Sequence, residues 1–240
     1  MMQELYGTQA PTLKAQLDGT RVATPWLSQQ VNDGRSELFV LFAKVQSLEG
    51  NGQPENCHAC APEVDAITYV RQPDGWTRES IVRDILQIGA WGQAPDIQTA
   101  EVLSLSPGHI ALAIPTGFSN QGYTDEGVVL LGHAENSWAA LGYLVTGGDN
   151  DGACAKPEDK EQFGSGPCYS YTSTYVPRLG TGQPYPDIIV THTGTRRDPD
   201  GSDGALLRDG QVIYAFNGTQ YQSDAQRRQA EAAAKIKPQR

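Results

Sequence analysis

The chain is 240 residues long and 38% hydrophobic, which is enough to bury a sizeable core. Its formal net charge of −10 argues against a nucleic acid as partner, because binding phosphates requires clustered Lys and Arg side chains. The sequence shows no run of the roughly 20 apolar residues that a membrane-spanning helix needs.

The N-terminal residues 1–35 are mostly polar and predict an extension that packs on the main domain. Residues 1–30 lack the apolar segment of a signal peptide. We therefore expect that a targeting segment has been removed ahead of Met1, and a cytosolic protein that begins at its natural Met is the alternative.

Short apolar segments joined by turns rich in Gly, Pro, Asn and Asp predict a series of strands over the following residues. The predicted strands cover 37–45, 64–70, 99–104, 109–114, 127–132, 138–146, 169–176, 187–193 and 211–216. Residues 79–89 fit either a short helix or an irregular strand. Turns are expected at Arg208-Asp209-Gly210 and at Asn217-Gly218.

The order of these segments predicts a mainly β fold. We expect an antiparallel meander over residues 36–222 that forms a sandwich, a propeller-like or a barrel-like single domain. The tail at residues 223–240 is Ala-, Gln- and Arg-rich and predicts a short helix, capped by Ser223, or a disordered end.

The four cysteines form two local pairs. An even number of cysteines in local pairs favours disulfides in an oxidising compartment, and we expect the pairing 57–60 and 154–168. The alternatives for Cys57-His58-Ala59-Cys60 are a redox-active CxxC and a zinc site. The first requires a following helix, and the second requires another closely spaced pair, whereas Cys154 and Cys168 are far apart.

Two acidic loops are candidate calcium sites, because calcium is bound by clustered carboxylate and amide oxygens. The candidate ligands are Asp149, Asp151, Glu158, Asp198, Asp200 and Asp203. Neither loop matches the EF-hand pattern, and the alternative is a pair of solvated turns in which Asp, Asn and Gly are favoured for local reasons.

The sequence has no nucleophile elbow, P-loop or HExxH motif. His133, with Glu135 nearby, is the candidate catalytic pair if the chain is an enzyme. A histidine that is hydrogen-bonded within a strand is the alternative reading.

Three aromatic residues are candidate binding residues. Trp91 lies between glycines in Gly89-Ala90-Trp91-Gly92, and Tyr169 and Tyr171 alternate on one predicted strand next to Cys168. Exposed aromatic rings bind peptides or carbohydrates, and packing over the disulfide is the alternative for the tyrosines.

Three segments carry a resemblance to known proteins. Cys57–Pro62, Pro186–Val190 and Tyr214–Tyr221 resemble segments of uncharacterised exported bacterial β-rich proteins. The last two are also similar to one blade of VCBS or FG-GAP propellers, although the calcium loop of those propellers is not reproduced. The resemblance implies an exported β-rich chain and transfers no activity.

These observations favour a non-catalytic binding module of the periplasm or the secreted fraction, such as an inhibitor or an immunity-type protein that binds a partner protein. A cell-envelope hydrolase whose site forms only in the fold is one alternative. Calcium-dependent glycan binding through the acidic loops is another.

Overall fold

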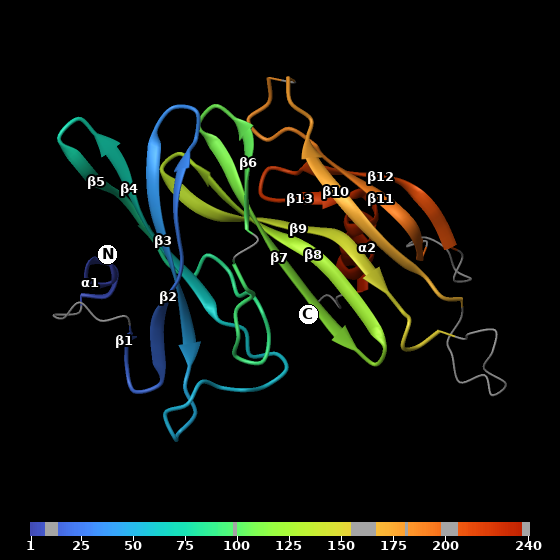
Figure 1. The fold of residues 1–240 in the computed structure, drawn as a ribbon, viewed down its shortest axis with the longest axis horizontal. Coiled ribbons are helices and arrows are strands. Elements are labelled where there is room, and N and C mark those ends of the chain that lie inside the picture. The colour runs from blue at the N-terminus through green and yellow to red at the C-terminus, as the bar shows by residue number, and fades with distance from the viewer. Residues whose placement is uncertain (8–13, 98–99, 155–166, 181, 198–205, 237–240) are drawn as a thin grey trace. The chain divides into compact units, whose positions relative to one another are not determined.

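The computed structural model describes residues 1–7, 14–97, 100–154, 167–180, 182–197 and 206–236. Within these residues the fold is mainly β, as predicted, and ends in a short helix (Figure 1). Its elements are α1 (Met2–Tyr6), β1 (Ala15–Gln16), β2 (Arg21–Asn32), β3 (Glu37–Ser47), β4 (Glu63–Gln72), β5 (Gly75–Val82), β6 (Glu101–Ser106), β7 (His109–Asn120), β8 (Tyr123–Ala134), β9 (Ser137–Asp149), β10 (Ser170–Pro177), β11 (Ile188–Arg197), β12 (Leu206–Phe216), β13 (Tyr221–Ser223) and α2 (Asp224–Ile236). Neither described helix has the length and hydropathy of a membrane span.

The chain divides into two compact units. The first comprises Met1–Ile114 and Leu131–Ala140, and the second comprises Pro115–Leu130 and Leu141–Arg240. The long strands β7, β8 and β9 therefore each contribute residues to both units.

The first unit contains a five-stranded antiparallel sheet in the order β1-β2-β3-β4-β5. Strand β3 lies in its middle and is almost continuously apolar, so Leu38, Val40 and Phe42 are fully buried. Trp138 of β9 packs on this sheet, with its ring 4.9 Å from that of Phe42 and its indole N–H donating to Thr68 Oγ1 at 2.9 Å. The core of this unit is thus formed by two packed sheet layers.

Helix α1 is fastened to the same sheet by a polar cluster. Buried Asp65 on β4 accepts hydrogen bonds from Tyr6 Oη at 2.9 Å and from the Asp84 N–H at 2.9 Å, and it pairs with Arg83 at 3.3 Å. Burial and the neighbouring Asp65 carboxylate raise the pKa of the Tyr6 phenol well above its usual range. The cluster satisfies a buried charge and holds the N-terminus in place.

The second unit contains a closed ring of five strands. Strands β10, β11, β12 and β13 follow one another, β13 pairs with β9, and β9 pairs in turn with β10. All of these pairs are antiparallel except β13 with β9. The barrel-like alternative of the sequence prediction therefore describes this unit, and the parallel pair departs from a pure meander.

The second disulfide, Cys154–Cys168, joins the segments that follow β9 and precede β10. Both predicted disulfides are confirmed by the structure. All four cysteines of the sequence are among the described residues, and none of them is free.

Two local predictions are corrected, and one that left two alternatives open is resolved. Residues 21–32, which we assigned to a polar extension, form β2, because Val22, Leu27 and Val31 turn inward against β3. Residues 79–82 continue strand β5, so the structure shows the strand alternative for these residues. Arg208-Asp209-Gly210 lies inside β12 rather than in a turn, and Asp209 lies opposite a β-bulge of β11, where the pairing shifts between His192 and Thr195.

The C-terminal helix has the predicted cap. The Gln226 N–H donates to Ser223 Oγ at 3.2 Å, and the Ser223 N–H donates to Gln226 Oε1 at 2.9 Å. This reciprocal pair satisfies two backbone donors at the helix start.

Candidate binding site at Trp91

Two loops of the first unit are joined at the Cys57–Cys60 disulfide. The first loop connects β3 to β4 and carries the disulfide, and the second follows β5 and carries Trp91. The Trp91 N–H donates to the Cys57 carbonyl at 3.1 Å, and the Gly92 N–H donates to the Cys60 carbonyl at 2.6 Å. The disulfide thus fixes the acceptors that hold the second loop.

Gly92 is the point of closest approach between these loops. Its φ is +68°, and a Cβ at this position would lie 2.2 Å from the Glu55 carbonyl oxygen, so no other residue fits without a shift of the backbone. The side chain of Gln46, which is buried on β3, donates to the Gly92 carbonyl at 2.5 Å. The second loop is therefore tied to the sheet as well as to the disulfide loop.

Trp91 combines two unfavourable features. Its φ is +54°, a left-handed conformation that is rare for bulky residues and costs of the order of 1–3 kcal/mol. Its side chain is also 53% exposed, although tryptophan is strongly favoured in cores and interfaces. The loop therefore holds Trp91 in a backbone conformation that bulky residues disfavour, and with an indole that is exposed rather than buried.

His58 supports the indole from the side. The two rings meet edge to face, with centroids 5.2 Å apart and an interplanar angle of 89°. His58 is the second residue of the Cys-His-Ala-Cys motif, so the disulfide also restricts its position. The result is an aromatic projection in which His58 packs on an indole that is 53% exposed.

A small cavity of about 190 Å³ adjoins this projection. Its walls include Gln46, Glu55, Cys60, Pro62, Gln87 and Gly92. Gln46, Cys60 and Gly92 also take part in fastening the two loops together, and Gly92 follows Trp91 directly, so we treat the cavity and the indole as one surface. We call Trp91, His58 and this cavity the Trp91 surface.

The predicted pair His133 and Glu135 is not brought together. Glu135 is exposed in the turn between β8 and β9 with a φ of +50°, whereas His133 is buried and lies 3.1 Å from Glu79 Oε2 through its Nε2. Glu79, on β5, is 54 positions away in sequence, and no local pattern indicates it.

The His133–Glu79 pair is enclosed in the first unit. The side chains are 2% and 11% exposed, and the His133 ring packs 5.1 Å from that of Trp138. His133 Nδ1 is buried without a hydrogen-bond partner among the described residues. A general acid or base must lie within hydrogen-bond reach of its substrate, and side chains this deeply buried do not offer that access. The His133–Glu79 pair is therefore a buried structural contact.

The acidic candidates for calcium are only partly described. Asp149 Oδ1 accepts the Asp151 N–H at 3.1 Å, which is a local turn within one loop. Glu158, Asp198, Asp200 and Asp203 lie outside the described residues. Among the residues that are described, no three His, Cys, Asp or Glu side chains form a group suited to a metal ion.

Tyr169 and Tyr171 lie in the second unit, and their ring centroids are 6.5 Å apart. They line a cavity of about 310 Å³ together with residues of β11, β12 and α2. The tyrosines therefore share one face, as the alternation predicts, and line this cavity.

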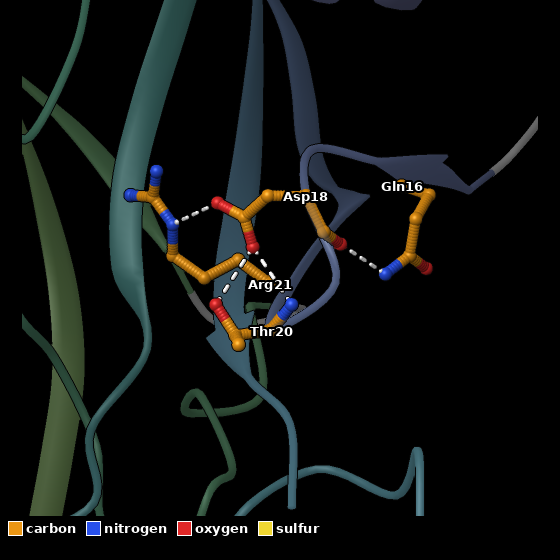
Figure 2. A network of polar contacts seen from close by, with 4 residues as sticks. All are labelled: Gln16, Asp18, Thr20 and Arg21. Atoms are coloured by element: carbon orange, nitrogen blue, oxygen red, sulfur yellow. Dashed lines mark hydrogen bonds and ion pairs between the residues drawn. The ribbon is translucent and has the colours of Figure 1, made fainter. Parts of the chain in front are cut away.

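A densely hydrogen-bonded exposed group at Asp18 forms a turn rather than a site (Figure 2). Asp18 accepts hydrogen bonds from the Thr20 N–H at 2.8 Å, from Thr20 Oγ1 at 2.7 Å and from Arg21 Nε at 3.0 Å. These contacts, those from Thr20 first, lower the pKa of the Asp18 carboxyl to about 2. All of them lie between β1 and β2, so they fix that hairpin.

Sequence reasoning named Trp91 and the Cys57–Cys60 pair separately but did not name Gln46 or the contacts of His58 and Gly92. The glycines around Trp91 are a local signal, and no sequence pattern links them to the cysteine pair, which lies about 30 positions earlier. Comparison with known proteins adds no assignment, because no protein-family model, curated protein or solved structure matches the chain.

Proposed function

We propose that the chain is a non-catalytic exported binding module, of the inhibitor or immunity type, that binds a partner protein through the Trp91 surface. The observation that carries the proposal is Trp91 itself, which is 53% exposed at a φ of +54° on a loop fastened by a disulfide. An observed backbone outlier of this kind is a reason to look for function, because folding alone does not favour it.

A protein partner fits this surface better than a small molecule. Tryptophan is among the residues most enriched at the energetic centres of protein interfaces, where it fills a pocket of the partner. The projection is held in advance by the hydrogen bonds from Trp91 and Gly92 to the disulfide loop, so little conformational entropy is lost on binding. The adjoining cavity would receive one side chain from the partner.

The compartment agrees with this proposal. Two disulfides indicate an oxidising, extracellular type of environment. The periplasm and the medium are both environments of this type, and we propose one of them as the place where the partner is met.

The experiment immobilises three forms of the chain: the original and two variants. It compares the proteins that each form captures from periplasmic extract and from culture medium. The test variant is Trp91→Gly, which removes the indole and replaces a strained residue with the one that tolerates φ +54°. The control is Trp76→Ala, because Trp76 of β5 is a second partly exposed tryptophan of the same unit, 38% exposed. We expect Trp91→Gly to weaken capture by roughly 30-fold, the loss typical of a central interface residue.

Quantitative mass spectrometry reads out the result, and near-ultraviolet circular dichroism confirms that both variants are folded. A protein that binds the original chain and Trp76→Ala but not Trp91→Gly supports the proposal. Equal recovery by all three forms, or no specific recovery from either source, contradicts it.

A further inference from the structure

The second unit contains a cavity of about 310 Å³, which falls within the range of small-molecule sites. It is distinct from the Trp91 surface, which belongs to the first unit. Its walls come from the strands of the ring and from the first two turns of α2, through Ala225, Gln226 and Gln229.

The interior of this cavity is mostly aromatic and aliphatic. Tyr169, Tyr171 and Tyr214 supply rings, and Val145 and Val212 supply aliphatic surface. Burial is the first cause of the raised pKa of each of these tyrosines, so their phenols stay protonated at physiological pH. A flat, apolar ligand would find complementary walls here.

Several of the polar groups on the walls already have partners within the protein. Tyr214 Oη accepts the Val145 N–H at 3.0 Å, His192 Nδ1 lies 2.6 Å from Ser173 Oγ, and Gln226 is engaged in the cap of α2 with Ser223. A sugar needs many hydrogen-bonding groups at once, and these are occupied. The cavity is therefore better suited to a ligand with few hydroxyl groups.

Arg196 differs from these residues. It lines the cavity, and its Nε–H is buried without a hydrogen-bond partner among the described residues. The Arg196 side chain as a whole is partly exposed, and an anionic group in the cavity would pair with its guanidinium through charge-assisted hydrogen bonds. Arg197 and Asp125 also line the cavity, so its three charged side chains carry a net charge of +1 (two arginines against one aspartate).

We infer that this cavity binds a small aromatic carboxylate, whose ring packs among Tyr169, Tyr171 and Tyr214 and whose carboxylate pairs with the guanidinium of Arg196. The inference rests on the coincidence of apolar walls, occupied polar groups and one unsatisfied guanidinium donor. It is independent of the partner protein proposed for the first unit.

Calorimetric titration of the purified chain tests the inference with three probes: benzoate, benzyl alcohol and glucuronate. We expect benzoate to bind, and both the neutral ring and the non-aromatic carboxylate to bind at least about tenfold more weakly, since each lacks one half of the recognised group. Tighter binding of glucuronate, equal binding of benzyl alcohol, or no saturable binding of benzoate overturns the inference.

Variants locate the site. Arg196→Gln should weaken benzoate binding by about tenfold through loss of the charged donor. Arg178→Gln is the matched control, because Arg178 is an arginine of the same unit that lies on the exterior and pairs with Asp187 at 3.4 Å. If Arg196→Gln weakens binding no more than Arg178→Gln does, the assignment of Arg196 is wrong.

A second measurement covers the case in which Arg196→Gln does not fold. Nuclear magnetic resonance of the unmodified chain should show benzoate-induced shifts at Tyr171, His192 and Tyr214, which line the cavity. Shifts confined to other residues would place the ligand elsewhere and overturn the inference.

Discussion

Asp18 illustrates how single residues of this chain shape their surroundings. Its carboxylate accepts three hydrogen bonds within four residues of sequence, and these favour the ionised form. The same residue is 42% exposed at its side chain, so solvent and salt screen its charge. Its effect is therefore local and depends on pH.

The expected pH dependence follows from the direction of the shift. The pKa of Asp18 is lowered from 3.8 to about 2, so its stabilising contribution is present above pH 3.8 and is lost as the pH falls through about 2. Carbon-13 titration of the Asp18 carboxyl should give a midpoint near 2. Asp18→Asn should show a smaller loss of stability than the original chain across this interval, and a midpoint near 3.8 would contradict the contacts in Figure 2.

At this scale, local sequence predicted what lies close along the chain. Cys57 with Cys60 and the cap at Ser223 are separated by a few positions, and each was predicted correctly. The contact of His133 with Glu79 spans 54 positions and depends on how β5 packs against β8. The positive φ of Trp91 was equally inaccessible, because it follows from hydrogen bonds to another loop.

Elements show the same division between local and distant information. Sequence patterns predicted most of the longer strands, whereas the short β1 and β13 were missed. Strand β2 was also missed, because its polar residues face solvent and its inward residues are spaced irregularly around Pro25, where the register shifts. The closure of the ring through β13 and β9 was also not predictable, since it pairs residues 79 positions apart in a parallel orientation (Tyr221 with Gly142). Such pairings are set by the whole sheet rather than by either strand.

The two disulfides are expected to contribute differently to stability. Cys154–Cys168 closes the longer loop, with a separation of 14 positions against 3, so on the chain-entropy model its removal should lower the free energy of unfolding by about 3 kcal/mol against about 2 kcal/mol for Cys57–Cys60. Urea unfolding of the two double Cys→Ser variants measures this difference.

Binding of the proposed partner should be weakened more by removing Cys57–Cys60 than by removing Cys154–Cys168. Removing Cys57–Cys60 loosens the carbonyls that hold Trp91 and Gly92, whereas Cys154–Cys168 lies in the second unit. A variant lacking Cys57–Cys60 that binds the partner with unchanged affinity would show that the disulfide does not organise the Trp91 surface.

For the molecule as a whole, the oxidised cysteines indicate the kind of compartment in which the fold is stable. All four cysteines are bonded, so the native protein should take up no alkylating reagent, and the denatured and reduced protein should take up four equivalents. Intact-mass measurement before and after reduction checks this count. Alkylation of the native protein at any cysteine would contradict the assigned pairing and the oxidising compartment.

The ring of the second unit closes where β13 meets β9 through one parallel residue pair, Tyr221 with Gly142. Gly142 has a φ of +111°, and a Cβ there would lie 2.8 Å from the Tyr221 carbonyl oxygen, so the strands touch closely but briefly. This seam is the place where the ring would part at the smallest cost in backbone hydrogen bonds. Because α2 follows β13 directly and lines the tyrosine-lined cavity, the shape of one cavity wall depends on this single pair of residues.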